Sequence, residues 1–421
     1  MTIRFSDALR AAIQLIQARQ AELSGNIVLV RDLQGRIRLM LEQSEQSHPP
    51  SYWKTLETEF QATVGAYAPP PGQVILHREG MFSPAAVFET PDLRPVAPKI
   101  SILDRTLIGA DWLRAPIVDK HPIVPRATFF GMKGGVGRST TLGLWARRLA
   151  QQGRKVLVVD LDLESPGVSS SLLPLDAQPA FGVVDWFVED GVGQADAELL
   201  HSMANSSPMA AGTSGEIRVV PAAGTSGHLL DKLARTYAAS FGERLAGMLD
   251  ALEEQEEPDI VLIDSRAGLH DIAAITVTRL HAWSFLFAVN TPQTWQGYRH
   301  LFQAWHGRSR FVKSFRDHLQ FVAALVPETG TDNYIDSTRR HAYELFLETL
   351  YDEAGKGDLD AFNFDLRDEE APHYACPIRW RREFQTFSPD APDTLNDAQI
   401  EAAYGEFFAR AEQLVLGVNT P

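Results

Sequence analysis

The sequence predicts a doubly wound α/β domain with a mostly parallel sheet, preceded by a small α+β module and followed by a helical C-terminal extension. From residue 126 onward, near-continuous apolar runs alternate with helical patterns, which is typical of parallel strands buried on both faces. A glycine-rich turn joins the first apolar run to a helix, and a proline-containing stretch separates this region from the residues before it. The six runs are residues 127–132, 156–159, 217–220, 260–263, 285–289 and 321–326.

The residues before the α/β region predict a separate module. Residues 6–23 have the spacing of an amphipathic helix, and residues 26–31 and 36–41 have the composition of two strands around a turn. Four prolines fall within residues 83–100, so we expect a linker there. The predicted parts are therefore 1–82 (α+β module), 83–125 (linker and lead-in), 126–330 (α/β domain) and 331–421 (helical extension packing on that domain).

Composition limits the function classes. The single cysteine, Cys376, excludes a disulfide within the chain and any Cys-x-x-Cys motif. No apolar stretch approaches the roughly 18–20 residues that cross a bilayer, so we expect a cytoplasmic protein. The net charge of −15 falls entirely after residue 125, because the residues before it hold equal numbers of basic and acidic side chains. Such an acidic body disfavours nucleic acid and anionic membranes as partners.

Residues 132–140 predict a phosphate-binding loop that takes ATP with Mg²⁺. The loop follows a strand and opens a helix, which is the context that a phosphate loop requires. Its glycines let the backbone approach phosphate oxygens, the helix N-terminus adds aligned N–H donors, and Ser139 is placed to hold Mg²⁺. The predicted nucleotide contacts are Lys133, Gly134, Gly135, Val136, Gly137, Arg138, Ser139 and Thr140.

The loop departs from the usual Gly-x-x-x-x-Gly-Lys-Ser/Thr pattern at two positions. Met132 stands where the first glycine would be, and Arg138 replaces the lysine. An arginine is a planar, permanently charged fork with a different reach from the lysine ammonium group. We therefore expect nucleotide binding, and we leave the rate of hydrolysis open.

The Lys-Gly-Gly-Val-Gly stretch resembles the deviant Walker A loop of the ParA/MinD family, within the SIMIBI class of P-loop NTPases, in its KGGVGR variant. The resemblance extends over about residues 127–330 and includes two later segments, Asp160-Leu161-Asp162 and Asp264-Ser265-Arg266-Ala267-Gly268. It implies that Asp160 and Asp264 assist the Mg²⁺ site with Ser139, that Asp162 polarises the attacking water, and that Lys133 reaches the partner's nucleotide across a sandwich dimer. It also implies a catalytic role for Arg138 and a base site near Pro327.

The function implied by this resemblance is a dimeric, ATP-hydrolysing switch that controls a partner protein. Two alternatives stay open: a nucleotide-binding scaffold with little hydrolysis because of Arg138, and a DNA-partitioning ATPase. The partner is unknown, and we expect it to use the N-terminal module or the C-terminal extension. Two basic clusters, at residues 308–316 and 379–382, are expected to face solvent or a partner rather than nucleic acid. The last helix, at about residues 397–416, is too acidic for a membrane anchor and is expected to pack in the core.

Overall fold

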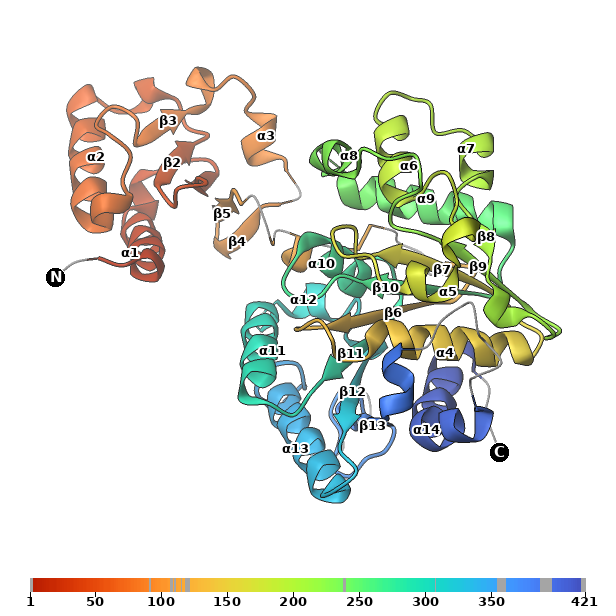
Figure 1. Cartoon of the computed structure of the whole chain (residues 1–421). Helices are drawn as coiled ribbons and strands as arrows, with labels where there is room; N and C mark the ends of the chain where they lie inside the picture. The colour runs from red at the N-terminus through yellow and green to blue at the C-terminus, as the bar shows by residue number, and fades with distance from the viewer. Residues whose placement is uncertain are drawn as a thin grey trace. The chain divides into compact units, whose positions relative to one another are not determined.

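The computed structural model describes residues 3–90, 92–106, 109, 111–114, 116–117, 122–237, 240–306, 308–353, 361–386 and 396–417. The chain forms two compact units, Met1–Ala110 and Asp111–Pro421, each with its own sheet (Figure 1). Parts of the predicted lead-in at 107–121 lie outside the described residues.

The first unit is a five-stranded sheet with two helices on one face. The sheet order is β3-β2-β1-β5-β4, in which β1 (Ile27–Arg31) pairs antiparallel with β2 (Ile37–Leu41) and β2 pairs parallel with β3 (Ile75–His77). Helices α1 (Phe5–Ala18) and α2 (Pro50–Val64) bury their apolar stripes against it. This is the α+β module that the sequence predicts.

The predicted linker at residues 83–125 is wrong in its first part. Strands β4 (Arg94–Ala97) and β5 (Ile100–Asp104) lie there, and β5 pairs parallel with the central strand β1. Ile100 and Ile102 are fully buried in the module's core, which is why this stretch is ordered. The prolines favoured a linker in the prediction, but Pro95 lies on an edge strand, where a missing N–H donor is tolerated.

The second unit is built on an eight-stranded sheet of order β13-β12-β11-β6-β10-β7-β9-β8. Every neighbouring pair is parallel except β8 with β9. The strands are β6 (Arg126–Gly131), β7 (Lys155–Leu161), β8 (Asn205–Ser206), β9 (Glu216–Val220), β10 (Ile260–Ser265), β11 (Trp283–Ala288), β12 (Leu319–Val326) and β13 (Cys376–Arg379). The predicted fold class is confirmed.

Helices cover both faces of this sheet (Figure 1). Phe129 and Phe130 are consecutive residues of β6, both fully buried, and belong to clusters on opposite faces. Helices α4 (Arg138–Gln151) and α14 (Asp397–Leu416) cover one face, whereas the other carries α9 (Phe241–Glu256), α10 (Asp271–Thr278), α11 (Pro292–Trp305) and α13 (Thr331–Thr349). The carboxyl ends of the parallel strands meet at one edge, where ligands of such sheets bind.

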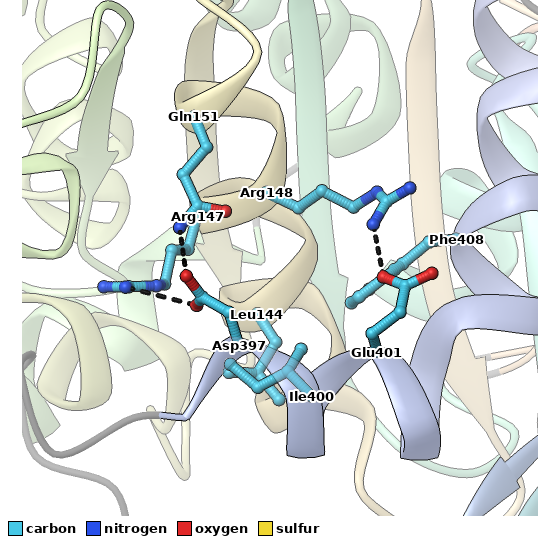
Figure 2. Close-up of a pocket in the computed structure, with 8 residues that line it drawn as sticks. All are labelled: Leu144, Arg147, Arg148, Gln151, Asp397, Ile400, Glu401 and Phe408. Carbon is cyan, nitrogen blue, oxygen red and sulfur yellow. Dashed lines mark hydrogen bonds and ion pairs between the residues drawn. The ribbon is translucent and has the colours of Figure 1, made fainter. Parts of the chain in front are cut away.

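The C-terminal extension is not wholly helical, because β13 adds a strand to the main sheet beside β12. Its last helix, α14, buries Ile400, Phe407 and Phe408 in the same core as α4. Figure 2 shows the polar margin of this contact, where Arg147 and Gln151 of α4 point to Asp397, and Arg148 points to Glu401. Within the described part of the chain, no helix is both long and apolar enough to cross a bilayer.

Candidate nucleotide-binding site

The glycine-rich loop leaves β6 at the centre of the sheet and runs into α4. Gly135 and Gly137 have φ angles of +71° and +88°, a region that side chains with a Cβ rarely adopt. No atom lies within 4 Å of where a Cβ would stand on Gly134 or Gly135. The loop therefore presents an open backbone face beside the N-terminus of a long helix, which is a suitable cradle for phosphate oxygens.

The inner side of the loop is closed by side chains. Val136 is buried, and a Cβ on Gly131 would meet the side chains of Val136 and Arg138 at 3.3 Å. The residue beneath the loop must therefore be small. On the outer side, the Lys133 ammonium group donates a hydrogen bond to Oε1 of Gln293, in the first turn of α11. The Lys133 side chain is thus bonded within its own chain and points away from the inner side of the loop.

Ser139 and Asp264 meet beneath the loop. The Ser139 hydroxyl donates to Oδ2 of Asp264 over 2.6 Å, and Asp264 is 1% exposed at the end of β10. Its other oxygen, Oδ1, has no hydrogen-bond partner among the described residues. A hydroxyl next to a half-satisfied buried carboxylate fits Mg²⁺, which prefers oxygen ligands and takes few of them from protein when it binds nucleotide phosphates. Among the described residues, no group of three or more His, Cys, Asp or Glu side chains could hold a metal ion.

Asp160 lies beside Asp264 on the neighbouring strand but has a different environment. The two residues are in register between β7 and β10. The Asp160 carboxylate accepts hydrogen bonds from the backbone N–H groups of Asp162, Gly167 and Ser169 and from the Ser169 hydroxyl, at 2.8–3.3 Å. It therefore shapes the loop after β7. The sequence analysis did not identify Ser169 as a site residue. The one available signal was its position shortly after the Ser165-Pro166-Gly167 turn.

The two buried carboxyl groups resist ionisation. Burial, reinforced by the charge of Asp264, raises the pKa of Asp160 to about 7. Burial also raises the pKa of Asp264 to about 6, although the charge of Arg138 and the Ser139 hydrogen bond oppose the shift. A cation placed between them would remove this cost.

Arg138 turns inward from the start of α4 and is only 7% exposed. One guanidinium nitrogen donates to the carbonyl oxygen of Ser265, and another lies 4.0 Å from Oδ2 of Asp162. Burial raises the pKa of Asp162 above its ordinary value, although the nearby charges of Arg138 and Arg266 oppose the shift. The structure thus brings Arg138, Ser139, Asp160, Asp162 and Asp264 together at the carboxyl ends of β6, β7 and β10.

Pro327 stands apart from this group. It follows β12, and the Leu325 side chain lies 3.8 Å from the Cβ position of Gly137, so this strand end does reach the loop. The Pro327 carbonyl accepts a hydrogen bond from the Thr331 hydroxyl. Thr140 occupies the first turn of α4, half-buried.

Comparison with known proteins places the central part of the chain in a nucleotide-binding family. The family model for the CobQ/CobB/MinD/ParA nucleotide-binding domain matches residues 127–331. No curated protein matches the chain significantly. The match covers the loop, the three aspartates and Pro327.

Several solved structures resemble this chain at low sequence identity. One is pNOB8 ParA, with 14% identity, 70% of this chain and 99% of that chain covered, and a TM-score of 0.45. A second is Cyanothece McdA in complex with ATP, with 14% identity, 71% and 98% covered, and a TM-score of 0.44. A third is the cobyrinic acid a,c-diamide synthase of Mycobacterium smegmatis with an ATP analogue and magnesium, with 17% identity, 71% and 98% covered, and a TM-score of 0.42.

Proposed function

Because residues 127–331 belong to the CobQ/CobB/MinD/ParA family of nucleotide-binding domains, we propose that this chain is a Mg²⁺-dependent ATPase that acts as a dimeric switch. The observation that carries the proposal is the pair of Ser139 and Asp264 beneath an open glycine loop, with one buried carboxylate oxygen left without a partner. That arrangement suits a nucleotide with its metal ion better than it suits a structural turn.

In this proposal the loop backbone at residues 133–140 and the start of α4 hold the phosphates. Ser139 would hold the metal ion, and Asp264 and Asp160 would assist. When bound, Mg²⁺ neutralises the charge of the β- and γ-phosphates. Pro327 lies on the side of the base.

Hydrolysis requires a positioned water. Asp162 is the half-buried carboxylate nearest to Arg138, and it would orient that water for in-line attack on the γ-phosphorus. Attack forms one P–O bond and breaks the bond from the γ-phosphorus to the bridging oxygen. The products are ADP and dihydrogen phosphate, which carries both water protons and releases one of them to solvent in part at neutral pH. Arg138 would stabilise the developing charge from the same chain.

Phosphate release tests the enzymatic part of the proposal. Wild-type protein should turn over with Mg²⁺, Asp162→Ala should lower the rate about 100-fold or more, and the exposed Asp336→Ala should leave it unchanged. The scaffold alternative is favoured by the burial of Arg138 against the Ser265 carbonyl. Tight binding of Mg-ATP without any Asp162-dependent turnover would establish that alternative, and faster turnover in Arg138→Lys would identify its cause.

The dimeric part of the proposal predicts a change of mass. Without nucleotide, Lys133 is bonded to Gln293 of its own chain; in a dimer it would leave Gln293 for the partner's nucleotide. Analytical ultracentrifugation should therefore show a monomer with ADP and a dimer with Mg²⁺ and a non-hydrolysable ATP analogue. Lys133→Ala should bind the analogue and stay monomeric. An unchanged mass at saturating analogue contradicts the switch.

The DNA-partitioning alternative gains little from the basic clusters. Arg316 is buried and paired with Asp352, and Arg379 and Arg381 are paired with Glu406 and Glu328. The side chain of Arg310 lies outside the described residues. Retention on DNA with ATP across a salt series decides this alternative, since binding that depends on ATP and falls steeply with salt would support it.

A further inference from the structure

Arg266 ties together the two loops that flank the candidate catalytic aspartate. It directly follows β10. Its guanidinium group forms an ion pair with Oε1 of Glu164, which stands two residues after Asp162 in the loop that follows β7. The two side chains are 29% and 31% exposed. The Nη1 atom that contacts Glu164 is itself buried, whereas other parts of both side chains reach solvent.

A third residue holds the carboxylate from another side. The Tyr237 hydroxyl donates to Oε1 of Glu164 over 2.7 Å. Burial and the bond to Glu164 raise the pKa of this phenol, so Tyr237 stays a donor at neutral pH. Its ring lies 5.6 Å from Phe241 and 5.4 Å from His270, measured between centroids. Glu164 thus has two donors, and only one of them carries a charge.

The pair borders Asp162. Glu164 stands two residues after it, and the charges of Arg266 and Arg138 both act to lower the pKa of Asp162. Asp162, in turn, is the residue next to which the γ-phosphate of a loop-bound triphosphate would lie. A phosphate group in that place would offer the Arg266 guanidinium more charge and more acceptor oxygens than the single carboxylate of Glu164 does.

We propose that Arg266 is a γ-phosphate sensor: it bonds Glu164 when the site is empty or holds ADP, and it leaves Glu164 for the terminal phosphate when the site holds ATP. A guanidinium group suits this exchange because it is permanently charged and its planar fork fits both carboxylate and phosphate bidentately. Tyr237 supports the exchange, since it keeps Glu164 hydrogen-bonded after Arg266 has left. The inference rests on the proposed nucleotide-binding function.

Equilibrium binding to the full chain tests the sensor, with Mg²⁺ present and two probes, ADP and a non-hydrolysable ATP analogue. Arg266→Ala should lower the affinity for the analogue about tenfold or more and change the affinity for ADP less than about threefold. The reason is that the lost hydrogen bond is charge-assisted and is made only to the γ-phosphate. Glu164→Gln removes the charge that competes for Arg266, so it should raise the affinity for the analogue and leave the affinity for ADP unchanged. In the Arg266→Ala background, Glu164→Gln should have no effect.

Matched controls separate this role from a general charge effect. Arg299 and Glu348 form an exposed ion pair at 3.8 Å on α11 and α13, and Arg299→Ala should change neither affinity. Thermal unfolding of each variant without nucleotide checks that it folds. If Arg266→Ala does not fold, Arg266→Lys and Glu164→Gln carry the test, because the selective gain from Glu164→Gln must still appear.

The outcomes are distinct. If Arg266→Ala lowers the affinities for ADP and the analogue equally, or lowers neither, the sensor proposal is overturned. A gain from Glu164→Gln that persists without Arg266 also overturns it. If the wild-type chain binds neither probe, the proposed function itself has failed, and that result is visible before any variant is compared.

Discussion

At the scale of single residues, the site concentrates unfavourable charge where a cation would be bound. Asp160 is satisfied by its own loop, whereas Asp264 has one partnered and one unpartnered oxygen, and both are buried. A buried carboxylate without full hydrogen bonding is costly unless a cation or a proton neutralises it. We therefore expect the carboxyl groups of Asp160 and Asp264 to hold protons at a pH where they would be ionised in the unfolded chain.

This proton uptake gives a pH dependence that can be predicted in sign. In the unfolded chain both carboxyls titrate near 3.8, and in the folded chain near 7 (Asp160) and near 6 (Asp264). The folded protein holds more protons between these values, so the free energy of unfolding should fall as pH rises from about 4 to 7 and level off above that. Asp264→Asn should flatten this fall and stabilise the nucleotide-free protein at pH 8 by about 1–3 kcal/mol, while abolishing stabilisation by Mg-ATP.

Urea unfolding at pH 5, 6, 7 and 8, with Asp336→Asn as an exposed control, measures this effect. The control should parallel the wild type at every pH. An Asp264→Asn variant with the wild-type slope, or one that Mg-ATP still stabilises fully, contradicts the assignment.

The sequence predicts residues that belong to a local pattern and misses those that are brought in by packing. Ser139, Asp160, Asp162 and Asp264 follow strand ends or open a helix, so their positions follow from the alternation of elements. Gln293 and Tyr237 reach the site from segments more than 70 residues away from Lys133 and Glu164 in the chain. Such pairings depend on how helices pack and on which rotamers that packing allows, and no short motif encodes them.

At the scale of elements, the central strands were predictable and the edge strands were not. The six apolar runs correspond to β6, β7, β9, β10, β11 and β12, because strands buried on both faces need continuous apolar sequence. β4 and β13 each span four residues, contain a proline and lie at sheet edges, so they lack that signal. Their pairing is decided by neighbours that are distant in sequence.

The contact of α14 with the phosphate-loop helix α4 offers a test at this scale. Arg148 bonds Glu412 at 2.7 Å and Glu401 at 2.5 Å, and Glu412 is almost fully buried (Figure 2 shows Arg148 and Glu401). Arg148→Met removes this cation from the buried Glu412 carboxylate, which keeps only weaker support such as the hydrogen bonds from Gln152, and should lower the free energy of unfolding by about 2–4 kcal/mol. Arg147, whose partner Asp397 is 63% exposed, is the matched control, and Arg147→Met should cost about 1 kcal/mol or less.

Chemical denaturation of both variants decides the point. A further variant that combines Arg148→Met with Glu412→Leu should recover most of the loss, because the buried charge is then gone. Similar losses in the Arg147 and Arg148 variants, or no recovery in the combined variant, contradict this view of the contact.

At the scale of the whole molecule, the chain consists of two units with separate cores. The first unit buries its apolar residues between its own sheet and helices, and the second does so on both faces of the larger sheet. Residues 1–110 carry no net charge, so the −15 belongs to the second unit. The sequence predicted the separation but placed the boundary near residue 82, because the prolines before β5 resemble a linker.

Separate cores predict separate folding. A fragment of residues 111–421 contains the whole sheet, the phosphate loop and all three aspartates, so it should fold, bind the ATP analogue with an affinity within about threefold of the full chain, and unfold in one transition. A fragment of residues 1–110 is large enough for its own core and should also fold alone. The full chain should show both transitions in calorimetry, each within a few degrees of its fragment. A single transition in the full chain, or a fragment 111–421 that fails to fold, means instead that the first unit is part of the same cooperative core as the nucleotide-binding domain and would have to be included in every test of the proposed switch.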